Sequence, residues 1–136
     1  MGIDYGEKRI GIAMTDLMQV ISSPFQVYQS VSPDKDIEYI SELIKDYSVE
    51  TVVFGMPYNM DGTEGARAIA TRKFAELLES RTNVKVDFED ERLTSVEAEE
   101  ILLSANVRRQ KRKQLIDKVS ASIILDAYIN RNKTRS

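Results

Sequence analysis

Four carboxylates stand where predicted secondary-structure elements begin or end. Asp4 follows a short first strand, Asp90 and Glu91 close the last strand, and Asp117 opens the final helix. Phosphodiester cleavage by two hard divalent ions needs oxygen ligands from separate elements, converging on cations about 3.5–4 Å apart. We therefore predict that Asp4, Asp117 and an acid of the Asp90-Glu91 pair bind metal. Any one of these acids alone would fit an N-cap or a turn, so the prediction depends on the acids being considered together.

The closing helix supports a buried position for Asp117. This residue shares a helix face with Ala121 and Ile124, at spacings of four and seven residues, and that face should pack on the sheet. Ser120 and Ala121 are small enough to allow close approach. A carboxylate buried there needs a cation or a hydrogen-bond donor.

Composition narrows the chemistry further. The chain contains neither cysteine nor histidine, which removes thiolate nucleophiles, thiol or imidazole metal ligands and Ser-His-Asp triads. Its 136 residues, 42% hydrophobic and 30% charged, predict a single globular domain over residues 1–136. There is no apolar run of membrane-spanning length, no signal-peptide pattern at the start and no cysteine for disulfides, so we expect a cytoplasmic protein.

Charge is unevenly distributed along the chain. The net charge is only -3, which by itself does not indicate a nucleic-acid binder. Between Val107 and Lys118, however, basic residues greatly outnumber acidic ones: Arg108, Arg109, Lys111, Arg112, Lys113 and Lys118 against Asp117. Such a run can be a solvated helix connection or a surface that follows a nucleic-acid backbone.

The hydrophobic pattern predicts the order of elements. Strands are expected around Ile3, over residues 9–15 and over 26–31, followed by a helix that Ser32-Pro33 would begin. A buried strand over 51–55, a second helix, a strand over 84–88, a capping box at 94–97 that marks a third helix and a closing helix over 115–129 complete the chain. An antiparallel meander followed by crossover units predicts an α/β protein with a mixed five-stranded sheet flanked by helices. This order matches the ribonuclease H-like fold.

The chain resembles the YqgF family, also called RuvX, in four motifs that occur in the same order. These motifs are residues 3–13 (IDYGEKRIGIA), 55–65 (GMPYNMDGTEG) and 90–95 (DERLTS), and Asp117 with the helix that includes 120–125 (SASIIL). The resemblance implies a ribonuclease H-like fold, a metal site and similarity to Holliday-junction resolvases. It also implies a nuclease that matures the 5′ end of pre-16S ribosomal RNA.

Strand alternation and family resemblance disagree about the Asp90-Glu91 pair. Alternation places Asp90 on the side of Val86 and Phe88, so Asp90 points inward if that apolar side faces the closing helix. The resemblance to resolvases points to a glutamate. We therefore favour Glu91 as the third ligand of Mg²⁺ or Mn²⁺, beside Asp4 and Asp117, with Asp90 as its catalytic partner.

The basic and loop residues near these motifs are predicted to contact nucleic acid. We expect Lys8 and Arg9 to bind a phosphate, the loop from Asn59 through Thr63 to border the cleft, and Arg92 to orient the acids or bind phosphate. The basic run would follow the backbone: Arg108, Arg109, Lys111, Arg112 and Lys113.

Four readings of function remain open. Pre-16S ribosomal RNA is the favoured substrate and branched DNA the second, and junction resolution would need two sites in a dimer. A non-catalytic RNA-binding assembly factor is another alternative. The turn at Asp4-Tyr5-Gly6-Glu7-Lys8 is like the phosphate loop of actin-like ATPases, but those proteins close two such domains around the nucleotide. We expect a monomer or a weak homodimer.

Overall fold

The computed structural model describes residues 1–15, 22–91 and 120–131. Strands β1 (Gly2–Tyr5), β2 (Arg9–Thr15) and β3 (Ser22–Gln29) are followed by helix α1 (Pro33–Asp46), strand β4 (Thr51–Met56), helix α2 (Ala66–Arg81) and strand β5 (Lys85–Asp90). Residues 120–131 form a further helix. The predicted helix that begins at 94–97, together with Arg92, Asp117 and the basic run, lies outside the described residues.

The five strands form one mixed sheet in the order β3-β2-β1-β4-β5. The opening meander is antiparallel, with Asp4 opposite Gly11, whereas β1, β4 and β5 run parallel to one another. The predicted α/β class, with a mixed five-stranded sheet, is confirmed. The carboxyl ends of the three parallel strands therefore meet at one edge of the sheet, where Asp4 and the end of β5 come together.

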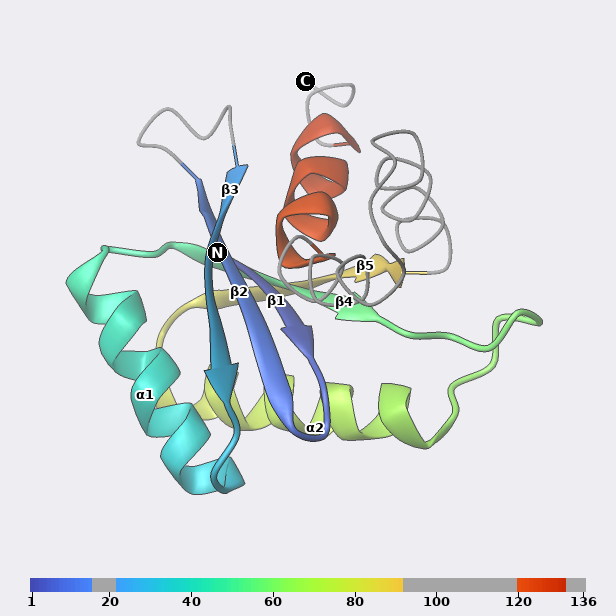
Figure 1. Ribbon diagram of the computed structural model, residues 1–136, viewed down its shortest axis with the longest axis horizontal. Helices are drawn as coiled ribbons and strands as arrows, with labels where there is room; N and C mark the ends of the chain where they lie inside the picture. The colour runs from blue at the N-terminus through green and yellow to red at the C-terminus, as the bar shows by residue number, and fades with distance from the viewer. Residues whose placement is uncertain (16–21, 92–119, 132–136) are drawn as a thin grey trace, which may run out of the picture.

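Helices cover both faces of the sheet (Figure 1). Helices α1 and α2 lie on one face, over a large core that includes Ile3, Phe54 and Phe74. The 120–131 helix lies on the other face, where Ala121, Ile124 and Leu125 pack with Ala13 and Val53. None of the helices that the structure describes is long and apolar enough to cross a membrane.

Helix α1 begins where the sequence predicted. Ser32 is the N-cap and accepts a hydrogen bond from the Lys35 amide at 3.3 Å, and Pro33 occupies the first helical position, where its missing N–H removes no hydrogen bond. The third strand, in contrast, begins earlier than predicted, at Ser22 instead of Gln26. Pro24 is tolerated because β3 is an edge strand and its pairing with β2 shifts at a bulge beside Ala13.

Candidate active site

Asp4 is held on a short strand in the interior of the sheet. Strand β1 has only four residues, but it pairs with β2 on one side and β4 on the other. The Val53 amide also donates to the Met1 carbonyl at 2.8 Å, which continues the pairing beyond the strand. Alternation puts Asp4 on the same face as Gly2, the face that the 120–131 helix covers. Its register partner is Gly11, which has no side chain to crowd the carboxylate.

The structure brings Glu91 into contact with Asp4. The Glu91 side chain follows β5, is only 9% exposed and hydrogen-bonds with the Asp4 carboxylate. Burial raises the pKa of Glu91 to about 9, and the negative charge of Asp4 and the hydrogen bond to it act in the same direction. The positive charge of Arg67 opposes the shift. Without a cation, this raised pKa favours the protonated form of Glu91 at neutral pH.

Gly55 makes room for Glu91. A Cβ atom at this position of β4 would lie 2.7 Å from Glu91 Cγ and 2.4 Å from Ile124 Cδ1. Contacts that short are excluded, so the glycine allows both the acid and the closing helix to approach the strand. Glu91 therefore packs between β4 and the 120–131 helix.

Asp90 points to the opposite face of the sheet. It lies in register with the buried Met56 of β4, and its neighbours Val86 and Phe88 pack on the core beneath α1 and α2. The apolar side of β5 thus faces α1 and α2, and the closing helix covers the polar side. Asp90 would have pointed toward the closing helix only if the apolar side of β5 faced that helix, and it does not. Glu91 is therefore the acid of the pair that lies beside Asp4.

The donor chemistry of Asp4 and Glu91 fits a hard divalent cation. Two carboxylates pressed together repel each other unless a proton or a cation lies between them, and oxygen is the ligand that Mg²⁺ and Mn²⁺ prefer. Within the described parts of the chain no three acidic side chains form a metal-binding group. The third predicted ligand, Asp117, lies outside those parts, so its position relative to the pair stays a prediction.

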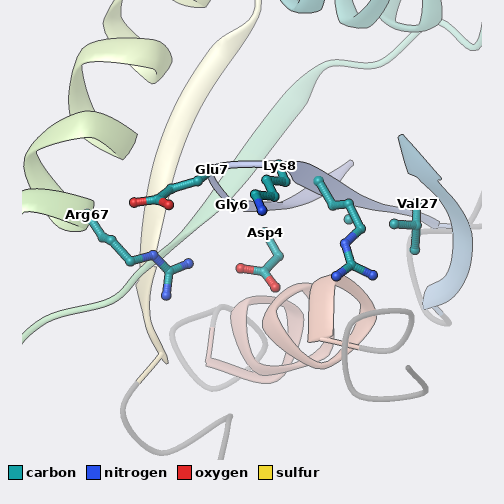
Figure 2. A pocket seen from close by; sticks show the side chains of 8 residues that line it. Asp4, Gly6, Glu7, Lys8, Val27 and Arg67 are labelled. Carbon is teal, nitrogen blue, oxygen red and sulfur yellow. The ribbon is translucent and has the colours of Figure 1, made fainter. Parts of the chain in front are cut away.

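A cavity of about 480 Å³ opens above Asp4 and is lined by the basic side chains of Lys8, Arg9 and Arg67 and by the acid Glu7 (Figure 2). Lys8, in the turn between β1 and β2, and Arg9, the first residue of β2, line the cavity, as the predicted phosphate contact requires. That turn is tight: the Gly6 amide donates to the Arg9 carbonyl at 2.9 Å, and a Cβ at Gly6 would lie 2.7 Å from the same oxygen. Gly6 thus permits the tight turn that brings Lys8 and Arg9 to the same cavity as Asp4.

The loop that contains Asn59 and Thr63 is organised by its own hydrogen bonds. The Asn59 amide nitrogen Nδ2 donates to Thr63 Oγ1 at 3.0 Å, and that hydroxyl donates to Asp61 Oδ1 at 2.6 Å. Gly62 has a φ of 88°, which favours glycine. Neither Asn59 nor Thr63 lines the cavity over Asp4 among the described residues, so their predicted contact with nucleic acid stays a prediction.

The sequence argument missed Arg67. This residue lies in the first turn of α2 and lines the cavity that contains Asp4. A signal was available, because a helix that follows a parallel strand begins near the carboxyl end of that strand. The first turn of α2 was therefore placed near the acids by the β4-α2-β5 order alone.

Comparison with known proteins identifies the family. The sequence model of RuvX, described as Holliday junction resolvase, matches residues 1–131. The chain belongs to the RuvX family. A relative in Halothermothrix orenii is 47% identical over 96% of this chain and 93% of its own, and one in Clostridioides difficile is 44% identical over 96% and 92%. Both carry the name "Putative pre-16S rRNA nuclease".

Two solved structures are similar to this RuvX chain in fold. RuvC of T. thermophilus in complex with a Holliday junction substrate is similar with a TM-score of 0.63 and 15% identity, over 98% of this chain and 94% of that one. The fowlpox virus Holliday junction resolvase has a TM-score of 0.50 and 13% identity, over 96% and 97%. The ribonuclease H-like fold is thereby confirmed.

Proposed function

We propose that this protein is a divalent-metal-dependent nuclease that cleaves phosphodiester bonds of precursor 16S ribosomal RNA in the cytoplasm. The observation that carries the proposal is the contact between the Asp4 and Glu91 carboxyls, with Asp4 in a cavity that Lys8 and Arg9 also line. Acids that bind cations and bases that bind phosphate are what hydrolysis of a nucleic-acid backbone needs on one surface.

The roles of the described residues follow from their positions, and Asp117 keeps the role that the sequence predicts. Asp4 and Glu91 would hold the cation, together with Asp117, whereas Asp90, on the opposite face of the sheet, would act only through its negative charge beside Glu91. A divalent cation at this point supplies Lewis-acid activation of water and stabilises the charge on the leaving oxygen. Lys8 and Arg9 hold a phosphate of the substrate above the acids, which fixes the scissile bond relative to Asp4. One domain, residues 1–136, carries these groups.

Ribosomal RNA is the proposed substrate because relatives over 40% identical carry the name of a pre-16S rRNA nuclease. Branched DNA is the second candidate, since the family description is that of a Holliday junction resolvase. The metal chemistry is the same for both substrates, and the difference would reside in cleft shape and contacts to the 2′-hydroxyl. Junction resolution would also require a dimer, because two strands are cut symmetrically.

The test compares cleavage of a precursor 16S rRNA fragment and a four-way DNA junction in the presence of Mg²⁺ or Mn²⁺. We expect the wild-type protein to cut the RNA, and we expect Asp4→Asn to cut neither substrate, because the amide has lost the charge that holds the cation. Asp46→Asn, at the exposed end of α1, is the matched control and should cut like the wild type.

The possible results separate the functions. Cutting of the junction alone, lost in Asp4→Asn, would replace RNA maturation by junction resolution. Equal cutting by wild type and Asp4→Asn would contradict the carboxylate site. Tight RNA binding without any metal-dependent cleavage would support a non-catalytic assembly factor instead.

A further inference from the structure

Arg67 stands apart from the other residues that line the cavity over Asp4. Among the described residues, the rest of the lining comes from β1, the turn after it, β2 and β3: Asp4, Gly6, Glu7, Lys8, Arg9, Gly11 and Val27. Arg67 reaches the same space from α2, which lies beyond β4 along the chain (Figure 2). The cavity therefore has a positively charged group on a second wall.

The guanidinium of Arg67 is not committed to another described side chain. Two other arginines of α2 are: Arg72 forms two bonds to Glu64, at 3.0 and 3.1 Å, and Arg81 donates to Asp34 at 3.0 Å. Within the described ranges 1–15, 22–91 and 120–131, the Arg67 guanidinium makes neither a hydrogen bond nor a salt bridge. Its backbone carbonyl, in contrast, accepts the Thr71 hydroxyl at 2.8 Å, so the helix turn that carries Arg67 is fixed.

A fixed backbone, whose guanidinium no described residue engages by a hydrogen bond or ion pair, suits a ligand from solution. A guanidinium presents a planar fork of N–H donors that matches the oxygens of a phosphodiester, and such charge-assisted contacts are shorter and stronger than neutral ones. Among the described residues, no acid of the cavity accepts a hydrogen bond from these donors, although the charge of Arg67 acts on Glu91 at longer range. The substrate backbone of a nuclease is an anion whose oxygens match the fork directly.

We propose that Arg67 binds a phosphate of the nucleic acid from the α2 wall of the cavity, on the side away from Lys8 and Arg9. This inference rests on the proposed nuclease function and adds a substrate-positioning residue to it. The backbone of the substrate then passes between two walls with Asp4 at the floor, and a phosphate is bound on each side of the acid. Contacts on two sides hold the scissile phosphate in place over Asp4 more closely than contacts from one wall.

The experiment compares Arg67→Gln and Arg67→Lys with Arg81→Gln. The control removes the same charge from the same helix, fourteen positions further on, and Arg81 lies outside the cavity over Asp4. Steady-state cleavage of the precursor 16S rRNA fragment gives KM and kcat. Binding of the same RNA, measured by fluorescence anisotropy between 50 and 300 mM salt in an Asp4→Asn background, gives a readout without catalysis.

Loss of one charged phosphate contact should raise KM and weaken binding by about tenfold or more, and should lower the salt slope by about 0.7. Arg67→Lys should recover part of the binding and the full salt slope, because it keeps the charge and loses the fork. Arg81→Gln should behave like the wild type.

Two results would overturn the inference. An unchanged KM and salt slope in Arg67→Gln, with wild-type cleavage intact, would remove Arg67 from the binding surface and leave the nuclease proposal standing. A loss of kcat alone, with no change in binding, would mean that Arg67 acts on the acids and not on the substrate. Absence of cleavage by the wild type would instead contradict the proposed function itself.

Discussion

At the scale of single residues, the site depends on the buried Glu91 beside Asp4. Burial and the negative charge of Asp4 raise the pKa of Glu91 to about 9. The folded protein therefore binds more protons at this position than the unfolded chain does, between the ordinary pKa of 4.5 and about 9. In the absence of a cation, the free energy of unfolding falls as the pH rises through that window.

Glu91→Gln should remove this dependence. The amide resembles the protonated acid, so the variant should match the wild type near pH 4 and exceed its unfolding free energy by at least about 1 kcal/mol at pH 8. Urea unfolding with a chelator at pH 4, 6 and 8 measures the difference, with Glu76→Gln on the exposed side of α2 as control. Parallel curves for the two glutamine variants would show that Glu91 is ordinarily ionised in the folded protein.

Residue types alone pointed to part of the site. Carboxylates at element ends predicted Asp4 and the Asp90-Glu91 pair, and the turn residues Lys8 and Arg9 were expected near them. Arg67 was missed because its residue type alone does not mark it. Its location becomes meaningful through the β4-α2-β5 order, which puts the first turn of α2 near the acids. The choice between Asp90 and Glu91 had the same difficulty: alternation separates the faces of β5, but it does not tell which face the closing helix covers.

At the scale of elements, three segments meet at the position of Glu91. Strand β4 contributes Gly55, the closing helix contributes Ile124, and the end of β5 contributes the acid. The same helix approaches β1 at Gly2, where an added Cβ would lie 2.7 Å from the Ala121 carbonyl oxygen. The closing helix thus packs closely against two glycines, Gly2 and Gly55. At Gly55 the candidate metal ligand Glu91 packs against the same position.

Gly55→Ala should damage both packing and activity. The new methyl group overlaps Ile124 and Glu91, so we expect a loss of about 1–3 kcal/mol in unfolding free energy and displacement of the carboxyl from Asp4. Gly2→Ala is the comparison, because it crowds the same helix without touching Glu91. Thermal unfolding and cleavage at a temperature where both variants are folded measure the two effects. An equal loss of cleavage in both variants would assign the damage to helix packing and not to Glu91.

Element boundaries followed local chemistry where that chemistry was strong. Ser32 and Pro33 located the start of α1, and the apolar run at 51–55 located β4 to within a residue of its observed end at Met56. The start of β3 was misplaced because Pro24 reads as a break. Pro24 is tolerated in β3 because this strand lies at the sheet edge with a bulge beside it. Both features belong to the tertiary structure and cannot be recognised from the local sequence.

At the scale of the whole molecule, the net charge of -3 is distributed unevenly between two surfaces. The exposed side of α1 carries Asp34, Glu38, Glu42 and Asp46 at four-residue spacing, whereas the cavity over Asp4 has Lys8, Arg9 and Arg67 beside the acids Asp4 and Glu7. The first surface should therefore repel a polyanion more strongly than the second. Binding should therefore be oriented even though the total charge is unfavourable.

The basic run is expected to extend that attraction along the nucleic acid. Replacing Arg108, Arg109, Lys111, Arg112 and Lys113 by glutamine should weaken binding to the precursor 16S rRNA fragment and reduce the salt slope by about 0.7 for each residue that neutralises a phosphate. Fluorescence anisotropy in the Asp4→Asn background between 50 and 300 mM salt measures the slope. Lys35→Gln with Lys45→Gln, both on α1, is the control that removes positive charge from the acidic side. If the five-residue variant and this control changed the slope equally, the basic run would be a solvated surface, and recognition would reside in the cavity over Asp4 alone.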